Sequence, residues 1–551
     1  MKKILLPLVV FGGMLISHAQ ETPVTEISAE ELAKRNWFHA DFESDSIYGV
    51  STDAAYKFVE SKNLKPSPII VAVIDSGVDI EHEDLKEVLW TNINEIPNNG
   101  IDDDNNGYVD DIHGWNFIGG PDGNVDEDTL EITRLVKEGM DLFETPDEFT
   151  NQNNKEKYPE KYEEYKKMKI QVEEELAKTN MTLAQIDAQI EGMLDAMNSF
   201  GNSYGMDKVI SVENLRAFEP ENNQAGALKE NFLNAVNTEK ADGLFGNTPA
   251  ELIAEIKTEI ENDPQRNYYL QRQKNYDVNF DPRPIVGDNY DDKTEKYYGN
   301  NDVDGPDSLH GTHVAGIIGA KYSNELGMDG VARHVEIMSV RTVPNGDERD
   351  KDVANAIRYA VDNGAKVLNM SFGKAYSPDK ELVWDAIRYA TEKGVLMVHA
   401  AGNDNKDIDT ESNYPTNFNE DGQDISDTWL TVGASTRYND KIKASFSNFG
   451  KKGVDIFAPG LEIYSTVPEN KYRYLQGTSM AAPVVAGVAA MVWSYYPTLS
   501  APELRELLIE SGNVNPDLTE ISTQGKVVNA LNAVKLADQK VKISRSKARR
   551  E

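Results

Sequence analysis

The chain has 551 residues, more than a single hydrophobic core usually serves, so we expect one large domain with an additional part. Hydrophobic residues make up 39% of the sequence, enough for a sizeable core. A net charge of −37 argues against nucleic acid as a partner and suits an acidic protein that binds cations. The absence of cysteine excludes disulfides, thiolate nucleophiles and cysteine-ligated zinc.

Residues 1–19 have the pattern of a signal peptide. Lys2 and Lys3 form a basic start, residues 4–16 form an apolar stretch, and Ser17-His18-Ala19 is a cleavage site of the small-x-small type. A membrane anchor needs about 18–20 apolar residues, more than this stretch provides, and we expect no other membrane span. The sequence therefore predicts an exported protein that is periplasmic or extracellular after cleavage.

The N-terminal segment 20–65 is expected to hold two short helices, one that starts with a capping-box pattern at Ser28 and one capped by Ser51 or Thr52 that ends at about Ser61. Residues 69–74 then form a continuous apolar run rich in β-branched side chains, which is typical of a strand buried on both faces of a parallel sheet. Asp75 follows directly. This places a carboxylate at the carboxyl end of a central strand, where open α/β sheets hold their chemistry.

Further strands and helices alternate downstream. The predicted strands are 335–340, 366–370, 395–399, 429–432 and 454–457, and the predicted helices are 352–362, 380–393, 480–496, 501–511 and 527–536. This alternation predicts an α/β fold with a doubly wound, mostly parallel sheet flanked by helices. We expect the domain to comprise residues 66–127 and 293–536, followed by a basic, frayed tail over 537–551.

Residues 128–292 do not fit this pattern. They lack buried-strand runs, and helical signals stand out instead. Thr182 opens a capping-box pattern, and Thr248 opens another with Pro249 at the first helical position. We interpret the segment as a long helical insertion that acts as a lid or an interaction module; the alternative is a solvated spacer without function.

A serine between small residues, in Gly477-Thr478-Ser479-Met480-Ala481-Ala482-Pro483, precedes an apolar run typical of a buried helix. At a helix N-terminus, free N–H groups and the dipole favour negative charge on a nearby substrate oxygen. A simple N-cap is the alternative interpretation. A nucleophilic serine also needs a base and a group that orients the base.

A base is available in His310-Gly311-Thr312-His313, which again leads into an apolar helix. An imidazole can take and return a proton near neutral pH, although one of the two histidines could instead be a metal ligand. Asp75 is the candidate for the orienting carboxylate. Asn403, which follows the predicted strand 395–399, could donate its amide N–H to a developing oxyanion.

Taken together, these motifs resemble those of subtilisin-type serine peptidases, the subtilases, in which the triad order is Asp, His, Ser. The matching stretches are Ala72-Val73-Ile74-Asp75-Ser76-Gly77-Val78-Asp79, His310-Gly311-Thr312-His313-Val314-Ala315-Gly316 and the serine stretch above. The resemblance covers residues from about 50 to 127 and from 293 to 536. It implies a triad of Asp75, His310 and Ser479, with Asn403 as oxyanion donor and His313 in a structural role.

The resemblance also implies how substrate binds. Ser371, Phe372 and Gly373 would form an edge strand that pairs with an extended peptide, and Ala401 and Gly402 would form part of a pocket wall. The insertion separates Asp75 from His310 much more widely than is usual in the family. The triad can still assemble if the two ends of the insertion lie close together, because closure entropy grows slowly with loop length.

A second predicted site is a calcium loop in the acidic stretch 102–111. Its pattern D-x-D-x-N-G-x-x-D resembles the start of an EF-hand, but position 12 is His113 rather than glutamate, so we expect a loop of related geometry. An acidic turn solvated by water is the alternative. The predicted ligands are Asp102, Asp104, Asn106, the Tyr108 carbonyl and Asp110, and the resemblance adds Asp84 and Asn324 from the usual calcium site of the family.

These features predict an exported serine endopeptidase that acts on polypeptides and carries structural calcium. Two alternatives stay open. One is a non-catalytic scaffold of the same fold that binds a partner on its insertion. The other is a processing peptidase in which the insertion restricts access to the active site.

Overall fold

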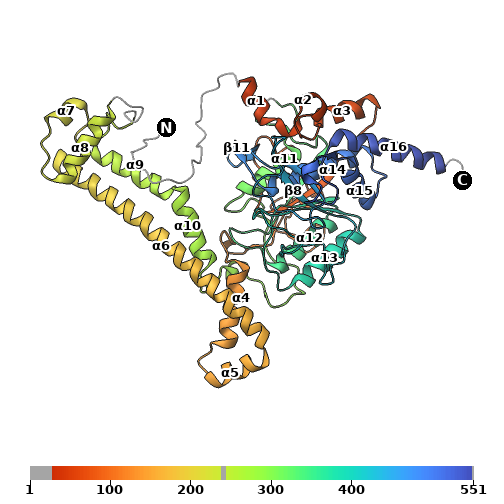
Figure 1. The fold of residues 1–551 in the computed structure, drawn as a ribbon, viewed down its shortest axis with the longest axis horizontal. Coiled ribbons are helices and arrows are strands. Elements are labelled where there is room, and N and C mark those ends of the chain that lie inside the picture. The colour runs from red at the N-terminus through yellow and green to blue at the C-terminus, as the bar shows by residue number, and fades with distance from the viewer. Residues whose placement is uncertain (1–27, 237–242, 325, 549–551) are drawn as a thin grey trace. The chain divides into compact units, whose positions relative to one another are not determined.

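A computed structural model describes residues 28–236, 243–324 and 326–548 (Figure 1), so the predicted signal peptide lies outside the described residues. The chain divides into two compact units. The smaller contains Leu135–Asn279, and the larger contains Glu21–Arg134 with Phe280–Glu551. The larger unit holds the sheet and every residue proposed for catalysis.

The sheet of the larger unit has the strand order β12-β13-β9-β8-β7-β6-β1-β5-β2 among the described residues. Every pairing in it is parallel except that of β12 with β13. The strands are β1 Ile69–Asp75, β2 Gly114–Asn116, β5 Val335–Arg341, β6 Val367–Met370, β7 Leu396–Ala400, β8 Trp429–Ser435, β9 Ile456–Pro459, β12 Asn513–Val514 and β13 Lys526–Val527. Chain order reverses beside β1, which confirms the doubly wound α/β prediction and puts Asp75 at the switch point.

Helices cover both faces of this sheet (Figure 1). On one face α3 (Thr52–Ser61), α11 (Leu309–Gly319), α14 (Thr478–Tyr495), α15 (Ala501–Ser511) and α16 (Ala530–Ala548) share a core with Val71 and Val73 of β1. On the other face α12 (Asp350–Asp362) and α13 (Lys380–Glu392) share a core with Ala72 and Ile74. Successive β1 side chains thus enter opposite cores, which explains the uninterrupted apolar run in the sequence.

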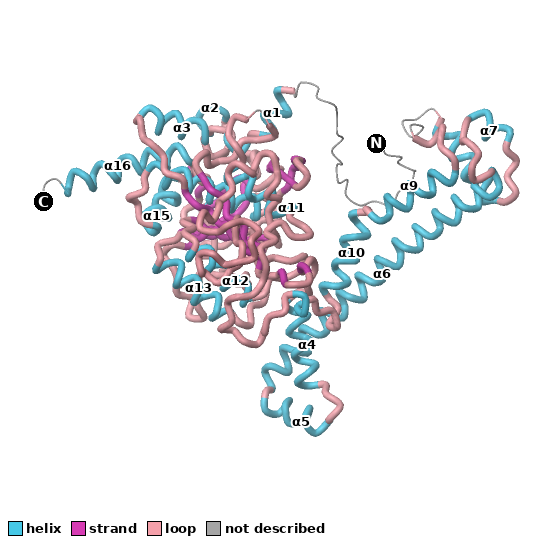
Figure 2. Tube along the Cα trace, turned by 180° about the vertical axis from the view of Figure 1, so that it is seen from behind, coloured by secondary structure: helices cyan, strands magenta, loops and turns pink. Residues whose placement is uncertain are grey.

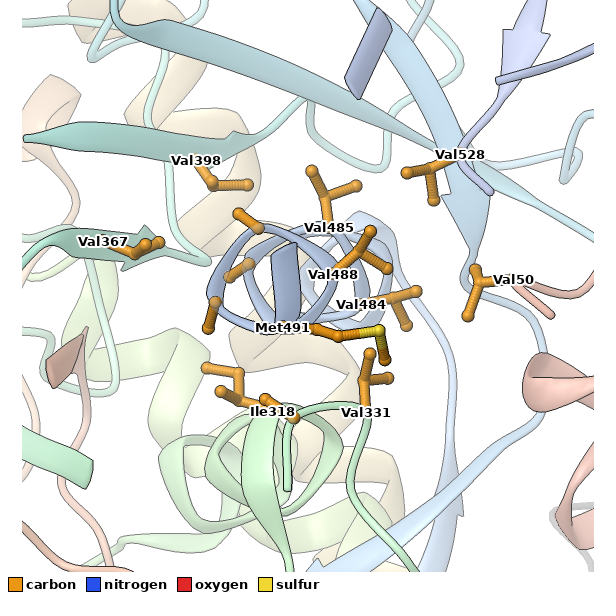
Figure 3. Close-up of a cluster of buried hydrophobic side chains, with 14 of the residues drawn as sticks. Val50, Ile318, Val331, Val367, Val398, Val484, Val485, Val488, Met491 and Val528 are labelled. Atoms are coloured by element: carbon orange, nitrogen blue, oxygen red, sulfur yellow. The ribbon is translucent and has the colours of Figure 1, made fainter. Parts of the chain in front are cut away.

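Helix α14 lies at the centre of the first core. Figure 3 shows Val484, Val485, Val488 and Met491 of this helix surrounded by side chains of the sheet, α11 and the N-terminal segment. Among the described residues it is the one helix long and apolar enough to cross a bilayer, but 94% of it is buried inside the protein. Its hydrophobicity is therefore that of a core helix.

The N-terminal segment is part of the larger unit. It contains α1 (Ala29–Arg35), a 3₁₀ turn (Trp37–His39), α2 (Phe42–Asp45) and α3. Trp37, Phe38 and Val50 are fully buried in the first core, and the N–H of Ala530 donates to the Val50 carbonyl. The segment therefore contributes to the stability of the fold.

Every regular element among the described residues of the smaller unit is a helix. Its helices are α4 (Glu131–Phe143, which starts in the larger unit), α5 (Glu148–Lys157), α6 (Pro159–Tyr204), α7 (Val212–Ala217), α8 (Asn223–Ala235), α9 (Pro249–Glu261) and α10 (Pro264–Asn275). Helices α6 and α10 run side by side (Figure 2), joined by the ion pairs Arg266–Asp187 and Arg272–Glu175. A separate core around Phe200 joins the end of α6 to α7, α8 and α9.

Two predictions about individual elements were wrong, and several short strands were not predicted. Thr182 does not start a helix but lies inside the 46-residue α6, where its hydroxyl donates to the Lys178 carbonyl, because no residue before it breaks the helix. The last helix does not end at 536, since α16 continues to Ala548. The short strands β2, β12 and β13 of the main sheet were missed, and Val527 of β13 was predicted within the last helix, which starts at Ala530. The strands β3 (Gly119–Gly120), β4 (Gly123–Asn124), β10 (Ile463–Val467) and β11 (Lys471–Leu475) were also missed, because pairing rather than local pattern creates them. Thr248, by contrast, forms the predicted capping box with Glu251.

Candidate active site

Asp75 and His310 meet at the carboxyl end of β1. The Nδ1 atom of His310 lies 2.6 Å from Oδ1 of Asp75. The aspartate is 1% exposed, whereas the histidine side chain is 36% exposed and reaches solvent. Gly311 allows this approach, because a Cβ on it would stand 2.0 Å from the Gly77 carbonyl oxygen. The residue after His310 is therefore glycine for a geometric reason.

The Asp75 carboxylate controls the protonation of His310. Burial lowers the pKa of the imidazole, but the charge and hydrogen bond of Asp75, aided by the charge of Asp307, outweigh burial and raise it above the ordinary value. Asp75 Oδ1 also accepts from the Ser76 N–H at 2.8 Å. Because the carboxylate accepts from Nδ1–H, Nε2 is left as the nitrogen that can take a proton.

Ser479 is the second residue of α14. Its Oγ donates to the Ser371 carbonyl at 3.1 Å, and the Ser371 hydroxyl donates to the Ser479 carbonyl at 2.9 Å. Pro483 has no N–H to offer that carbonyl four residues earlier, so the Ser371 hydroxyl replaces the missing helix bond. No hydrogen bond joins Ser479 to His310 among the described residues. The serine hydroxyl therefore donates to the backbone directly after β6.

The amide of Asn403 has a fixed orientation. Its Oδ1 accepts from the Thr478 N–H at 2.8 Å and from the Thr478 hydroxyl at 3.0 Å, and that hydroxyl in turn accepts from the Gly402 N–H. Since two donors occupy Oδ1, the N–H₂ group is left to point away from the helix start. The side chain is exposed, so this N–H₂ group can donate to a ligand above Ser479.

His313 lies one turn further along α11. Its Nε2 is 3.1 Å from the Ile463 carbonyl oxygen and 3.0 Å from that of Arg473, so Nε2 carries the hydrogen. Burial is the largest effect and lowers the pKa of His313 to about 3. The ring is neutral and joins α11 to the β10–β11 hairpin.

The residues predicted to bind substrate surround the end of β6. Ser371 and Phe372 have carbonyls that accept from Ser479 Oγ and from His399 Nε2 respectively. The N–H and C=O of exposed Gly373 bond to nothing among the described residues, so both are available to an extended peptide. Ala401 is fully buried and its carbonyl accepts from the Asn413 and Asn448 amides, whereas Gly402 is partly exposed.

A buried ionic cluster holds the segment that follows β6. Lys374, directly after Gly373, is 2.7 Å from Glu131 and 2.8 Å from Asp350, and donates to the Glu348 carbonyl. Burial alone would lower the pKa of Lys374, but the charges of Glu131 and Asp350 outweigh burial and raise the pKa above its ordinary value. Burial raises the pKa of Glu348 to about 8, and its Oε1 has no hydrogen-bond partner among the described residues. Glu348 is thus a neutral acid at neutral pH.

In the acidic loop, three carboxylates converge. Oxygen atoms of Glu95, Asp104 and Asp111 lie within 4.8 Å of one another, which makes this cluster able to hold a metal ion. Burial raises the pKa of Asp111 to about 6. An all-oxygen set of carboxylates has the hard-ligand chemistry that calcium prefers.

The other predicted ligands in this loop have different partners. Asp102 accepts from the N–H groups of Asn106 and Gly107, and Asp110 accepts from those of Asn99 and Gly100. The Asn106 amide N–H₂ donates to Asp104 and Asp111. The Tyr108 hydroxyl donates to the Lys296 carbonyl.

Asp84 and Asn324 form a separate pair. The Asn324 amide N–H₂ donates to Asp84 Oδ1 at 2.6 Å, and the Tyr472 hydroxyl donates to Oδ2 at 3.2 Å. Burial raises the pKa of this carboxyl above its ordinary value. The structure thus brings the two residues together as a hydrogen-bonded pair.

Arg349 joins the two chain segments of the larger unit that flank the insertion. Its guanidinium bonds Asp128, before the insertion, at 2.8 Å and lies 3.5 Å from Asp281, after it. The two ends of the insertion are therefore connected within the larger unit, as assembly of the triad requires.

Four contacts at these sites were not predicted from the sequence. Glu95 and Asp111 were not expected in the carboxylate cluster, Ser371 was not expected to bond Ser479, and Asn413 was not expected beside Ala401. Asp111 directly follows the motif used to find the loop, so the paired aspartates at its end were the available signal. Glu95 and Asn413 stand in stretches without a pattern, and only the fold brings them to their sites.

Comparison with known proteins agrees with the motifs. The family model described as "Subtilase family" (Peptidase_S8) matches residues 67–529. The thermophilic serine proteinase of Bacillus sp. (strain AK1) is 41% identical over 198 residues, 35% of this chain and 45% of the relative. Thermitase of Thermoactinomyces vulgaris is 42% identical over 186 residues, 34% of this chain and 61% of the relative. The matched region thus spans less than two thirds of either relative.

Among solved structures, one described as proteases from Pseudoalteromonas arctica PAMC 21717 is similar at 28% identity. The match has a TM-score of 0.38 and covers 43% of this chain and 78% of that one.

Proposed function

Because the chain belongs to the subtilase family, we propose that it is a serine endopeptidase that hydrolyses polypeptides through Asp75, His310 and Ser479. The observation that carries the proposal is the 2.6 Å contact of His310 Nδ1 with the buried Asp75 carboxylate, together with the place of Ser479 as second residue of α14. A carboxylate on Nδ1 leaves Nε2 as the base that a serine nucleophile needs.

The reaction begins when the Ser479 hydroxyl turns from the Ser371 carbonyl to His310 Nε2. The imidazole takes the serine proton as Oγ attacks the scissile carbonyl carbon, and the Asp75 carboxylate stabilises the resulting imidazolium. Asn403 N–H₂ and the Ser479 N–H donate to the oxyanion. The imidazolium then protonates the leaving amine, and water, activated by the same histidine, hydrolyses the acyl-enzyme.

The test is the Ser479→Ala variant. We expect it to lose about 10⁶-fold in kcat and all labelling by a fluorophosphonate, with an unchanged melting temperature. Thr478→Ser, which keeps a hydroxyl beside the nucleophile, is the matched control and should still be labelled. Full labelling of the alanine variant would refute the assignment.

We further propose that calcium binds at Glu95, Asp104 and Asp111 and stabilises the fold by mass action. Like charges within 4.8 Å repel one another, and a divalent cation relieves that repulsion. Addition of calcium should raise the melting temperature of the wild type and not that of Asp104→Asn. If calcium raises the melting temperature of Asp102→Asn as much as that of wild type, the ion binds at this cluster and not at the loop ligands predicted from the sequence. Asp84 and Asn324 are the candidates for a second calcium site.

Export follows from the sequence pattern of residues 1–19 and is proposed on that basis alone. Expression of the full chain in a bacterium, with N-terminal sequencing of the exported protein, tests it. A new N-terminus directly after Ala19 is the expected result, and retention of Met1 in an unexported protein contradicts it.

A further inference from the structure

Gly373 lies between two neighbours whose positions are fixed. The Phe372 carbonyl accepts from His399 Nε2 at 2.9 Å, and Lys374 exchanges both main-chain hydrogen bonds with Tyr414, at 2.9 and 2.8 Å. Among the described residues nothing bonds the N–H or C=O of Gly373 itself. Glycine has no side chain that could pack and hold its backbone, so the place of these two groups depends on the neighbours.

The side chain of Lys374 adds an anchor inside the protein. It is 1% exposed, and its Nζ lies 2.7 Å from Glu131 Oε2 and 2.8 Å from Asp350 Oδ1. The same ammonium donates to the Glu348 carbonyl at 2.8 Å. Two carboxylates and a carbonyl thus surround it. Movement of Lys374 away from them would leave buried charges without partners, which costs several kcal/mol in proteins, roughly 3–5 for a broken buried pair.

Both carboxylates belong to the first residues of helices. Glu131 begins α4 and accepts from Arg134 Nε and Nη2 at 3.2 and 2.7 Å. Asp350 begins α12 and accepts from the Ser377 hydroxyl at 2.9 Å. The anchor of Lys374 is therefore itself held from two sides. Because α4 continues into the smaller unit, Glu131 also stands at the point where the chain leaves for the insertion.

The distance of Gly373 from the nucleophile determines which substrates reach it. The Ser371 carbonyl accepts from Ser479 Oγ, and Gly373 is two residues further along an extended backbone. A peptide that pairs with this backbone therefore reaches Gly373 with a residue about two positions from the scissile bond, since extended chains advance equally. A substrate with a single residue before that bond does not reach Gly373.

We propose that Lys374 is a positioning residue of the peptidase, which sets the place of Gly373 through its buried ion pair with Glu131 and so favours extended peptides over substrates with one residue before the scissile bond. The inference rests on the proposed function, because Gly373 acts on a substrate only if the site binds peptides. Misplacement of Gly373 weakens two main-chain hydrogen bonds to an extended peptide, which lowers kcat/KM about tenfold.

The test measures kcat/KM for a tetrapeptide amide and for an amino-acid ester with the same residue before the scissile bond. Lys374→Met keeps an unbranched side chain and removes the charge. The ratio of the two values, peptide over ester, should fall by at least about tenfold, while kcat/KM for the ester stays within about twofold of wild type. Glu131→Gln keeps the shape of its side chain and removes one charge, so the ratio should fall by at least about threefold.

Lys351→Met is the matched control, because Lys351 is a buried lysine with the same kinds of partners. Its Nζ lies 2.7 Å from Asp288 and 2.9 Å from Glu295, and it donates to the Asn289 carbonyl at 2.8 Å. In the part of the chain that the structure describes, no hydrogen bond or ion pair joins it to residues 371–374. This variant should have a lower melting temperature than wild type and an unchanged ratio of peptide to ester hydrolysis.

Fluorophosphonate labelling provides the active fraction of each variant, so partial misfolding does not alter the ratio. Ratios within twofold of wild type in both Lys374→Met and Glu131→Gln, or an equal fall in Lys351→Met, would overturn the positioning role. If Lys374→Met yields no folded protein, Glu131→Gln decides alone by the same criterion. A wild type with neither labelling nor hydrolysis would instead refute the proposed peptidase function.

Discussion

Two carboxylates near His310 act on it in different ways. Asp75 touches the ring and fixes which nitrogen carries the hydrogen, whereas Asp307 contributes through charge alone. Both raise the pKa of the imidazole. Since the neutral ring is the base, peptidase activity should be lost as pH falls through a midpoint above the ordinary histidine value near 6.5.

Asp75→Asn should reduce kcat by about 10⁴-fold, because the amide favours the wrong tautomer. The midpoint of the remaining activity should move to lower pH, since the raised pKa of His310 returns toward its ordinary value. Asp307→Asn is the control, with a smaller downward shift and kcat near that of wild type at high pH. The measurement is kcat/KM against pH, and equal shifts in both variants would contradict the direct role of Asp75.

At the scale of elements, the start of α12 and the segment after β6 that contains Gly373 and Lys374 are joined by charge. Lys374 connects Glu131 and Asp350, while the Glu348 carboxyl stays protonated beside them. Burial is the main cause of that raised pKa, and the anions Asp347 and Asp350 add to it, against the opposing charge of Lys374. The same cluster that aligns the strand therefore makes its stability depend on pH.

Because folding raises the pKa of Glu348 to about 8, the folded state binds more protons than the unfolded state above the ordinary glutamate pKa. This group consequently lowers the free energy of unfolding as pH rises from about 4.5 to 8. The Glu348→Gln variant has no carboxyl at this position that can ionise. Over that pH range its free energy of unfolding should therefore fall by at least about 1 kcal/mol less than that of wild type.

Urea unfolding at pH 5, 6.5 and 8 checks this prediction for Glu348→Gln. Glu43→Gln, at an exposed glutamate of α2, is the control and should follow wild type at all three pH values. Parallel curves for wild type and Glu348→Gln would show that the carboxyl is already ionised in the folded protein.

At the scale of the whole molecule, the larger unit has its own cores on both faces of the sheet, and the smaller unit has its own core around Phe200. Arg349 holds Asp128 and Asp281 together within the larger unit. The two ends of the insertion are thus connected through Arg349 within the same unit that holds Asp75 and His310.

Replacement of residues 135–279 by a short glycine-serine linker should leave the larger unit folded, with kcat/KM on short peptides within about threefold of wild type. Circular dichroism and fluorophosphonate labelling measure the fold and the active site. Comparison of short peptides with an unfolded protein such as casein then tests the insertion itself. A selective gain in casein cleavage would indicate that the insertion restricts access, and loss of labelling would contradict the independence of the larger unit.

The sequence by itself determined much of the fold and the chemistry of the candidate site. Runs such as Ile69–Asp75 identify central strands because a strand buried on both faces needs apolar residues at every position. The stretches around Asp75 and His310 stand out because a close backbone approach requires glycine at Gly77 and Gly311, and the stretch around Ser479 because Gly477 has a positive φ.

Only the tertiary structure decided which groups meet. The Ser371 hydroxyl completes the helix bond that Pro483 cannot make, Glu95 and Asp111 join Asp104, and Asn413 lies between Gly373 and Gly402. The sequence did not reveal these contacts, because hydrogen bonds and charge pairs act over a few ångströms in space and leave no periodicity along the chain.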